Sequence, residues 1–365
     1  MRNPEISVVI PFYREGALIS DSIDSVLNQS FKDFEIILID NNADELTRNH
    51  AKSYGIRYPN QIRLIYEPQQ GITFSKNSGI LESRGRLISF LDGDDLMKPE
   101  KLQKQYEVIN KRDDLVLVAS NYDILSYDSS RILDKDIPSP AYDIQSFDRL
   151  INEYLILFKN TFSPSYLNSF GLYLPSTWLV RKEALVKSGL FNTNLNFGWD
   201  DYDLLMRLFQ FGGFYKINES LSLYRAESQE TRAQKNKSYN KKKRFISVQR
   251  YVASIWDEFD NCSYNISTLR KICSIWLQVF GLALIKYENG LKYGRTLFLR
   301  CVFNNPTDLS SWTLFLKSFM PRSLHPKLFW FNNFNTDSLI EIDLNLIKSF
   351  LAFPIKYDLD KEEYN

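Results

Sequence analysis

The chain has 365 residues, with 45 Lys and Arg against 44 Asp and Glu, 44% hydrophobic residues and only two histidines. This is the composition of a folded globular protein, and its balanced charge excludes a bulk attraction to nucleic acid, so we expect no nucleic-acid partner. Two histidines, His50 and His325, exclude an HExxH zinc site. Any acid–base or metal chemistry must therefore rely on carboxylates.

Strand and helix signals alternate along residues 6–121. The expected strands are short runs rich in Ile, Val, Leu and Phe, at 6–10, 34–40, 62–66, 87–91 and 115–121. The expected helices lie between them, at 18–30, 44–54, 73–83 and 99–111. This alternation predicts a doubly wound, mostly parallel α/β sheet, which binds its ligand at the carboxyl ends of the strands.

The pattern changes twice in the rest of the chain. Turn residues between 122 and 170 predict a long, partly irregular insertion. Regular elements return at 176–180 (strand), 181–187 (helix), 202–211 (helix) and 222–225 (strand). Residues 232–350 then carry 18 Lys and Arg against 8 Asp and Glu and are rich in aromatic residues. We expect two domains, an α/β domain at 1–231 and a mostly helical region at 232–365.

The sharpest local feature is Asp92-Gly93-Asp94-Asp95, directly after the expected buried strand 87–91. Carboxylates at i and i+2 on a turn can share one hard cation, and Mn²⁺ or Mg²⁺ completes its coordination with phosphate oxygens of a substrate. The alternative is a solvated acidic turn. The position at the carboxyl end of a central strand, beside other polar loops, favours a metal-bound diphosphate.

A second acidic group lies at the start of the expected helix 202–211. Asp200 and Asp201 precede this helix and Asp203 lies in its first turn. One carboxylate is expected as a helix cap, and a spare one can act as general base on an acceptor hydroxyl. Lys76, near the start of helix 73–83, is either a solvated lysine or a cation that faces a nucleotide.

Seven segments, taken together, resemble the family 2 glycosyltransferases, which have the GT-A fold. They are residues 7–15, 25–35, 37–42, 71–79, 91–95, 200–208 and 223–225. They occur in the family's order and cover about residues 5–232. The resemblance implies a Rossmann-like, mixed, mostly parallel sheet with flanking helices. It also implies metal-dependent, inverting transfer of a sugar from a nucleotide-diphosphate sugar, most often a UDP-sugar, to a glycan or lipid-linked acceptor of the cell surface.

The resemblance also implies roles for single residues. The nucleotide-sugar would contact Pro11, Phe12, Tyr13, Glu15, Asp40, Asn42, Lys76, Asp92, Gly93 and Arg225. Asp201 would be the catalytic base, with Asp200 beside it. The metal would bind Asp94 and Asp92. Glu227 stands where the family often has a histidine, so either Glu227 is a further ligand or the metal has fewer protein ligands.

Several alternatives stay open. A sugar nucleotidyltransferase or a dehydrogenase would need a glycine-rich loop after the first strand, and residues 11–16 are not one. A non-catalytic relative that binds sugar nucleotide or scaffolds an assembly is the remaining rival. The basic region 232–365 either attaches to the inner face of the cytoplasmic membrane, packs on the first domain or forms a homodimer. No signal peptide is apparent in residues 1–5, so we expect a cytoplasmic location.

Overall fold

The computed structural model describes residues 2–134, 142–146, 149–150, 174–195, 200–225, 295 and 316. The chain divides into two units, Met1–Ser238 and Tyr239–Asn365, and nearly all described residues belong to the first. The expected domain boundary at residue 231, the helical character of region 232–365 and the position of Glu227 lie outside the described residues.

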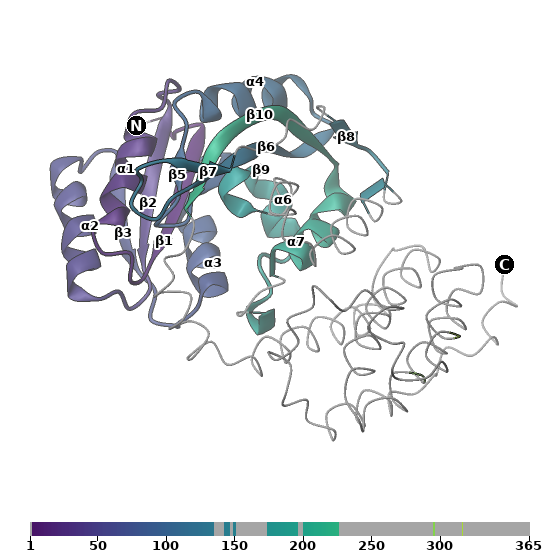
Figure 1. Ribbon diagram of the computed structural model, residues 1–365. Helices are drawn as coiled ribbons and strands as arrows, with labels where there is room; N and C mark the ends of the chain where they lie inside the picture. Colours follow the sequence, from purple (N-terminus) through teal and green to yellow (C-terminus); the bar gives the residue numbers. More distant parts are fainter. Residues whose placement is uncertain are drawn as a thin grey trace, which may run out of the picture. The chain divides into compact units, whose positions relative to one another are not determined.

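A mixed sheet forms the centre of the first unit (Figure 1). Its described strands are β1 (Ile6–Phe12), β2 (Phe34–Asp40), β3 (Ile62–Tyr66), β4 (Leu87–Phe90), β5 (Leu96–Met97), β6 (Leu115–Leu125), β7 (Ile132–Asp134), β8 (Tyr142–Ile144), β9 (Leu179–Arg181) and β10 (Gly213–Arg225). They follow the order β3-β2-β1-β4-β9-β6-β10-β5, while β7 pairs with β6 and β8 with β10. β1 is parallel to β2 and β4, β2 to β3, and β6 to β10; β9 is antiparallel to its neighbours β4 and β6. The predicted mixed, mostly parallel sheet is confirmed.

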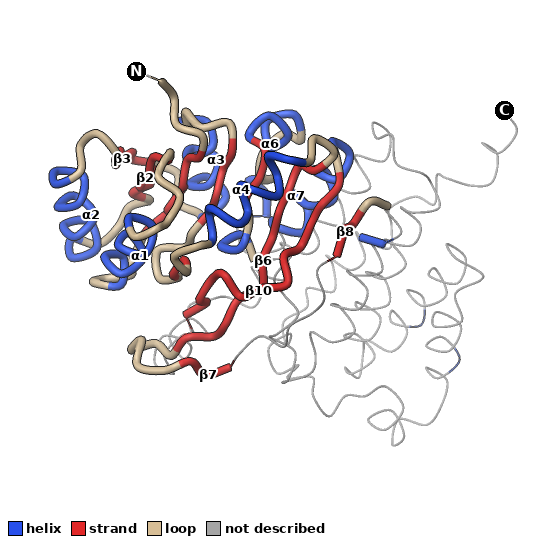
Figure 2. Tube along the Cα trace, turned by 90° about the horizontal axis from the view of Figure 1, so that it is seen from above, coloured by secondary structure: helices blue, strands red, loops and turns tan. Residues whose placement is uncertain are grey.

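Helices cover both faces of the parallel half of the sheet. The described α-helices are α1 (Leu18–Leu27), α2 (Glu45–Arg57), α3 (Ile72–Glu82), α4 (Lys101–Lys111), α6 (Lys182–Lys187) and α7 (Asp200–Leu208). α1 and α2 lie on one face and α3 on the other (Figure 2). α1 buries Ile19, Ile23 and Val26, at the i, i+4, i+7 spacing of one helix face. α3 approaches β1 closely, since a Cβ on Gly79 would lie 2.2 Å from Val9 Cγ1.

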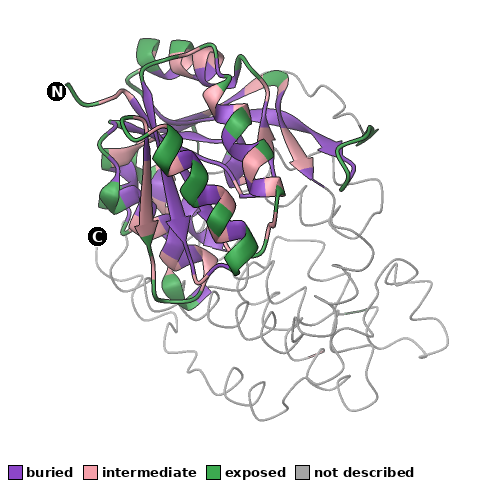
Figure 3. Ribbon diagram, turned by 90° about the vertical axis from the view of Figure 1, so that its left-hand side faces the viewer, coloured by how far each residue is buried: buried purple, intermediate pink, exposed green. Residues whose placement is uncertain are grey.

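The core lies between these helices and the strands, which are buried along most of their length (Figure 3). β1, β2 and β6 are buried at every position. This burial explains why the continuous apolar runs of the sequence form strands that are covered on both faces.

Three expectations about the elements need correction. β6 continues to Leu125 rather than ending at residue 121, and β7 and β8 lie in the segment that is predicted to be partly irregular. β10 begins at Gly213 rather than at residue 222. The sequence does not reveal its first part because the register of its pairing with β6 is irregular between Ile217 and Ser222, which breaks the alternation that marks a strand. The expected strand 176–180 is a 3₁₀ turn, Pro175–Thr177, followed by β9. β5 was not expected, because two residues carry no periodic signal.

This topology positions the polar loops of the sequence. β1, β2 and β4 are parallel neighbours, so the loops that follow Phe12, Asp40 and Phe90 leave the sheet at one edge. β5 directly follows the Asp92–Asp95 segment, and β10 pairs with β5 through Leu223 and Leu96. Arg225 and the acidic segment are thereby neighbours in space, although about 130 positions separate them in the sequence.

Candidate active site

Four acidic side chains gather where β1 and β4 end: Glu15, Asp92, Asp94 and Asp95. The pKa of Glu15 is raised to about 7. Burial is the largest cause, and the negative charges of Asp94 and Asp92 contribute smaller parts. Burial and the same two charges raise the pKa of Asp95 well above its usual value. Gly93 lets the two segments approach, because a Cβ there would lie 3.1 Å from Glu15 Cγ. This concentration of negative charge favours a bound cation.

The residues of this cluster fit a hard cation that also takes oxygens from a ligand. Asp92 Oδ1 is buried and finds no hydrogen-bond partner among the described residues. No group of three or more His, Cys, Asp or Glu side chains within the described ranges is placed to hold a metal by itself. A Mn²⁺ or Mg²⁺ ion at Asp92 and Asp94 would therefore need phosphate oxygens or water as its other ligands, as is usual for these ions.

The segment Asp92–Asp95, called the DGDD turn below, is held by residues from three other elements. Ser176 Oγ donates to Asp95 Oδ2 at 2.7 Å and accepts from Asp92 N at 3.1 Å. Arg225 N donates to Asp95 Oδ1 at 3.0 Å. Ser22 Oγ on α1 lies 2.9 Å from Gly93 O. The fully buried Asp95 therefore anchors the turn to its surroundings rather than facing a ligand.

The second acidic group lies at the start of α7. Asp200 is buried, and its Oδ2 lies 3.8 Å from Lys76 Nζ on α3. Burial raises the pKa of Asp201 to about 8, and the charge of Asp200 adds to the effect. Burial also raises the pKa of Asp200, and the charge of Asp92 contributes to this rise. The DGDD turn and the start of α7 are thus within electrostatic reach of each other.

Lys76 is the cation between these acidic groups. Burial lowers its pKa, but the carboxylates of Asp200, Asp92 and Asp201 raise it by more. Its Nζ also lies 5.2 Å from the centre of the Phe191 ring. Lys76 therefore belongs to the environment of the acids, whereas the resemblance implied a contact with the nucleotide base.

The segment before α7 is fixed to α3 beside Lys76. Asn77 Nδ2 donates to Phe191 O at 2.8 Å, and Phe191 N donates to Asn77 Oδ1 at 2.9 Å. Asp203, in the first turn of α7, pairs with Arg207 and so has a structural partner. Taken together, the site has two acidic groups within electrostatic reach of each other, and Lys76 interacts with both.

Comparison with known proteins identifies the family of the first unit. Residues 7–186 match the family model "Glycosyl transferase family 2". These residues, about half of the chain, form a glycosyltransferase family 2 domain. An uncharacterized glycosyltransferase of Rickettsia prowazekii is 28% identical over 229 residues, which are 63% of this chain and 66% of that protein. The chain thus spans somewhat less than two thirds of the first curated relatives that it matches. The putative teichuronic acid biosynthesis glycosyltransferase TuaG of Bacillus subtilis is 32% identical over 138 residues, 38% of this chain and 54% of TuaG.

Solved structures support the fold of this family 2 domain. Residues 1–349 of S. aureus TarS align with a TM-score of 0.56 at 14% identity, over 95% of this chain and 91% of that one. The TarS structure in complex with UDP-GlcNAc gives a TM-score of 0.58 over the same shares of the two chains. The GT-A fold that the resemblance implied is confirmed.

In the loop after β2, Asp40 and Asn42, which the resemblance implies as ligand contacts, also form hydrogen bonds within the protein. Asp40 Oδ2 accepts from Arg48 Nε at 2.6 Å, and Asp40 Oδ1 accepts from Ala43 N at 2.9 Å. Asn42 has a left-handed backbone, with φ of 61°. Its side chain accepts from Tyr66 Oη at 2.7 Å. Both predicted ligand residues thus also shape the loop in which they lie.

Asn41 is a residue that motif reasoning passed over. Its Nδ2 donates to Glu67 O at 3.0 Å and to Gln69 O at 2.7 Å, and its Oδ1 accepts from Gly71 N at 2.7 Å. One side chain therefore fixes the loop that leads into α3 to the end of β2. The Asn41-Asn42 pair at a strand end is a turn signal, but nothing in the sequence shows which loop it binds.

The predicted nucleoside-binding residues at the end of β1 differ in how far they are buried. The Phe12 ring is 2% exposed and belongs to the hydrophobic core, and its contact with the nucleoside stays a prediction. Pro11 is also buried. Tyr13 is half-buried, and the Arg14 guanidinium lies 4.7 Å from the centre of its ring. Glu15 Oε2 accepts from Tyr13 N at 2.6 Å, which ties this loop to the acidic cluster.

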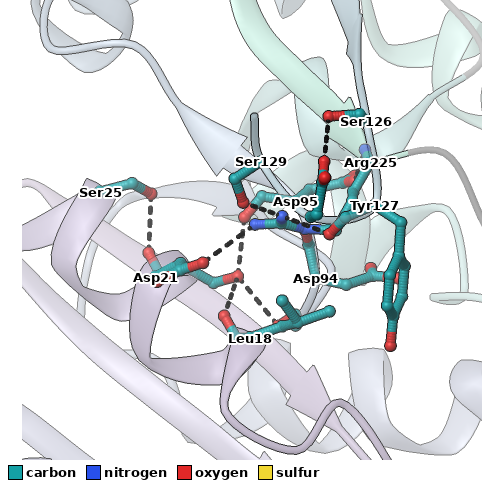
Figure 4. A network of polar contacts seen from close by, with 12 residues as sticks. Leu18, Asp21, Ser25, Asp94, Asp95, Ser126, Tyr127, Ser129 and Arg225 are labelled. Atoms are coloured by element: carbon teal, nitrogen blue, oxygen red, sulfur yellow. Dashed lines mark hydrogen bonds and ion pairs between the residues drawn. The ribbon is translucent and has the colours of Figure 1, made fainter. Parts of the chain in front are cut away.

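Arg225 is predicted to contact the donor, and its side chain also has several partners within the protein. Its side chain is buried, and Nε donates to Asp94 O at 2.7 Å. Its terminal nitrogens bind Tyr127 O at 3.0 Å, Ser129 Oγ, and Asp21 Oδ2 at 3.2 Å (Figure 4). The guanidinium thus points into the fold and holds protein groups.

Proposed function

We propose that this protein transfers a sugar from a nucleoside-diphosphate sugar, of the UDP class, to a hydroxyl of a glycan or lipid-linked acceptor of the cell surface, with inversion at the anomeric carbon and with Mn²⁺ or Mg²⁺. The observation that carries the proposal is the pair of acidic groups, the DGDD turn and Asp200-Asp201, with the buried Lys76 between them. Inverting transfer needs a cation on the leaving diphosphate and a base near the acceptor hydroxyl, on opposite sides of the sugar.

On the donor side, Asp92 and Asp94 are the proposed metal ligands. When bound, the ion would neutralise the charge that develops on the diphosphate as it leaves. The buried, unpartnered Asp92 Oδ1 supports this assignment. Glu15, whose pKa is raised to about 7 by burial and by the charges of Asp94 and Asp92, lies beside these two carboxylates.

On the acceptor side, Asp201 is the proposed general base. A pKa of about 8 places this carboxyl near the pH at which an effective base works, since a base with a very low pKa attracts the proton only weakly. Lys76 stabilises the negative charge of the neighbouring Asp200. Asp201 would act as the base in its ionised form, whose share rises as the pH approaches and passes 8. Removal of the acceptor proton by Asp201 would then accompany attack on the sugar.

The nucleoside is proposed to bind at the ends of β1 and β2, against Pro11, Tyr13 and Asp40. The UDP class is supported by the S. aureus TarS structures in complex with UDP and with UDP-GlcNAc, which share the fold. A cell-surface acceptor is supported by the similarity to the putative teichuronic acid biosynthesis glycosyltransferase TuaG.

A separate proposal concerns the region 232–365, which we assign as a second domain that attaches to the inner face of the membrane. Its support is charge alone, since the excess of Lys and Arg there matches anionic headgroups, at about 1 kcal/mol for each charge near the surface. No described helix has the length and apolar character that crossing a bilayer would require.

Ligand-induced stabilisation tests the donor site. The melting temperature of the whole chain would be measured with UDP, GDP, dTDP and CMP, each with and without Mn²⁺, for the wild type and Asp94→Ala. A nucleotide at 100 times its Kd raises stability by about 2.7 kcal/mol, which is measurable as a higher melting temperature. We expect UDP to stabilise the wild type only with metal and the variant not at all. The same shift in Asp94→Ala would contradict the metal assignment, and no shift with any nucleotide would favour a non-catalytic relative.

A further inference from the structure

Arg225 has a set of partners that a donor-binding arginine does not need. Its side chain is 1% exposed, and four of its N–H groups are directed at protein oxygens. Two of these oxygens are main-chain carbonyls, on Asp94 and Tyr127, and a third is the hydroxyl of Ser129. The fourth is the half-exposed carboxylate of Asp21 on α1, which supplies the opposite charge.

The contact with Asp94 completes the hydrogen bonding of the DGDD turn. The carbonyls of Asp92, Gly93 and Asp95 are bonded within the turn or to Ser22. The carbonyl of Asp94 instead accepts from Arg225 Nε. This bond fixes the peptide that carries the proposed metal-binding carboxylate, and the direction of a side chain follows from its main chain.

The same guanidinium reaches the turn that joins β6 to β7. This turn, residues 126–130, is closed by its own bonds, since Asp128 Oδ1 accepts from Ser126 Oγ at 2.6 Å and from Ser130 N at 3.1 Å. Arg225 binds the turn at Tyr127 and Ser129 and binds the DGDD turn on the other side (Figure 4). One buried side chain therefore connects two loops that are about 30 residues apart in the sequence, together with α1.

We propose that Arg225 is a positioning residue: it holds the Asp94 main chain against the 126–130 turn and α1, and so sets metal affinity without contacting the donor. The metal part of this proposal rests on the proposed function. The structural part, that Arg225 orders both turns, does not.

Hydrogen–deuterium exchange of the ligand-free chain tests the structural part. The variants are Arg225→Gln and Arg225→Lys, and Arg181→Gln is the matched control. Arg181 also donates to main-chain carbonyls, those of Leu115, Ile109 and Arg112, but it pairs with Leu87 at the opposite end of β4 from the DGDD turn.

We expect Arg225→Gln to raise exchange at least tenfold at the amides of Asp95, Met97, Ser129 and Arg131, which are bonded within or beside the two turns. Arg181→Gln should leave these amides unchanged. Arg225→Lys keeps the positive charge but loses the several N–H donors of the guanidinium, so it should give an increase in amide exchange between those of the wild type and Arg225→Gln. It also serves as the folded variant if Arg225→Gln does not fold. Unchanged exchange in a folded Arg225 variant would overturn the proposal.

Titration with Mn²⁺ and UDP tests the metal part. For Arg225→Lys we expect the Mn²⁺ concentration at half-saturation to rise about tenfold, while the Kd of UDP at saturating Mn²⁺ stays within threefold of the wild type. A rise of the UDP Kd that persists at saturating Mn²⁺ would mean that Arg225 binds the diphosphate, against the proposal. If the wild type binds no UDP at any Mn²⁺ concentration, the proposed function fails, and the exchange experiment alone decides the positioning role.

Discussion

Asp201→Asn should make the protein more stable at neutral and higher pH while it removes the proposed base. Folding raises the pKa of this carboxyl from about 3.8 to about 8, mainly through burial. Between these values the unfolded chain binds fewer protons than the folded chain, so the free energy of unfolding falls as pH rises from about 4 to 8 and then levels off. An amide cannot ionise, and the variant therefore avoids this loss.

The size of the effect follows from the pKa difference. If fully expressed, a pKa rise from 3.8 to about 8 lowers the free energy of unfolding by about 6 kcal/mol at pH 8. Asp201 is half-buried, and the nearby charge of Lys76 offsets part of the penalty. We therefore expect a gain of about 2 kcal/mol, or about 4–8 °C in melting temperature for a unit the size of Met1–Ser238.

Calorimetric melting at pH 5 and pH 8 tests this reasoning. The stabilisation of Asp201→Asn over the wild type should be small at pH 5 and several degrees at pH 8. Asp114→Asn is the control with opposite sign, because a hydrogen bond from Arg112 lowers the pKa of Asp114. An Asp201→Asn protein that is destabilised equally at both pH values would refute the account of a buried, protonated carboxyl.

Three further predictions concern other parts of the site. Asp94→Asn should lower metal-dependent turnover at saturating donor by at least about 10²-fold, and an unchanged Mn²⁺ requirement in the variant would exclude Asp94 as a ligand. Lys76→Met removes the cation that lowers the pKa of Asp201, so the rise of the pH–rate profile should move up by about one pH unit; an unmoved profile would separate Lys76 from the base. Asn41→Ala loses three main-chain partners and should lower the free energy of unfolding by about 2 kcal/mol, whereas the exposed Asn110→Ala should change it by less than about 0.5 kcal/mol in the same urea titration.

The parts of the fold that the sequence predicts are those with a strong local signal. β1, β2 and β4 are continuous apolar runs that the sheet buries on both faces, and they were expected within one or two residues of their observed bounds. The early part of β10 was missed because its irregular pairing with β6 breaks the two-residue alternation. β9 lies between β4 and β6 in the sheet, and no local pattern reveals such an insertion.

In the site, too, the sequence predicts the features that have a local signal and misses those that depend on distant contacts. Short motifs and their order along the chain were sufficient to name the DGDD turn and the Asp200-Asp201 pair as acidic groups. They were not sufficient to assign a separate role to each residue of these groups, because the roles depend on contacts between distant segments of the chain. Asp95 anchors the turn through Ser176 and Arg225, and the side chain of Arg225 binds the protein rather than facing out from it. Such pairings, 81 to 131 residues apart, leave no trace in local spacing.

Release of UDP from a panel of UDP-sugars, with and without Mn²⁺, tests the central claim most directly. The whole chain would be compared with Asp94→Asn and Asp201→Asn, and Asp114→Asn would serve as a folded control outside the site. The account predicts metal-dependent UDP release from at least one UDP-sugar by the wild type and the control, and a loss of at least about 10²-fold in both site variants. Equal UDP release by wild type and both site variants would contradict it.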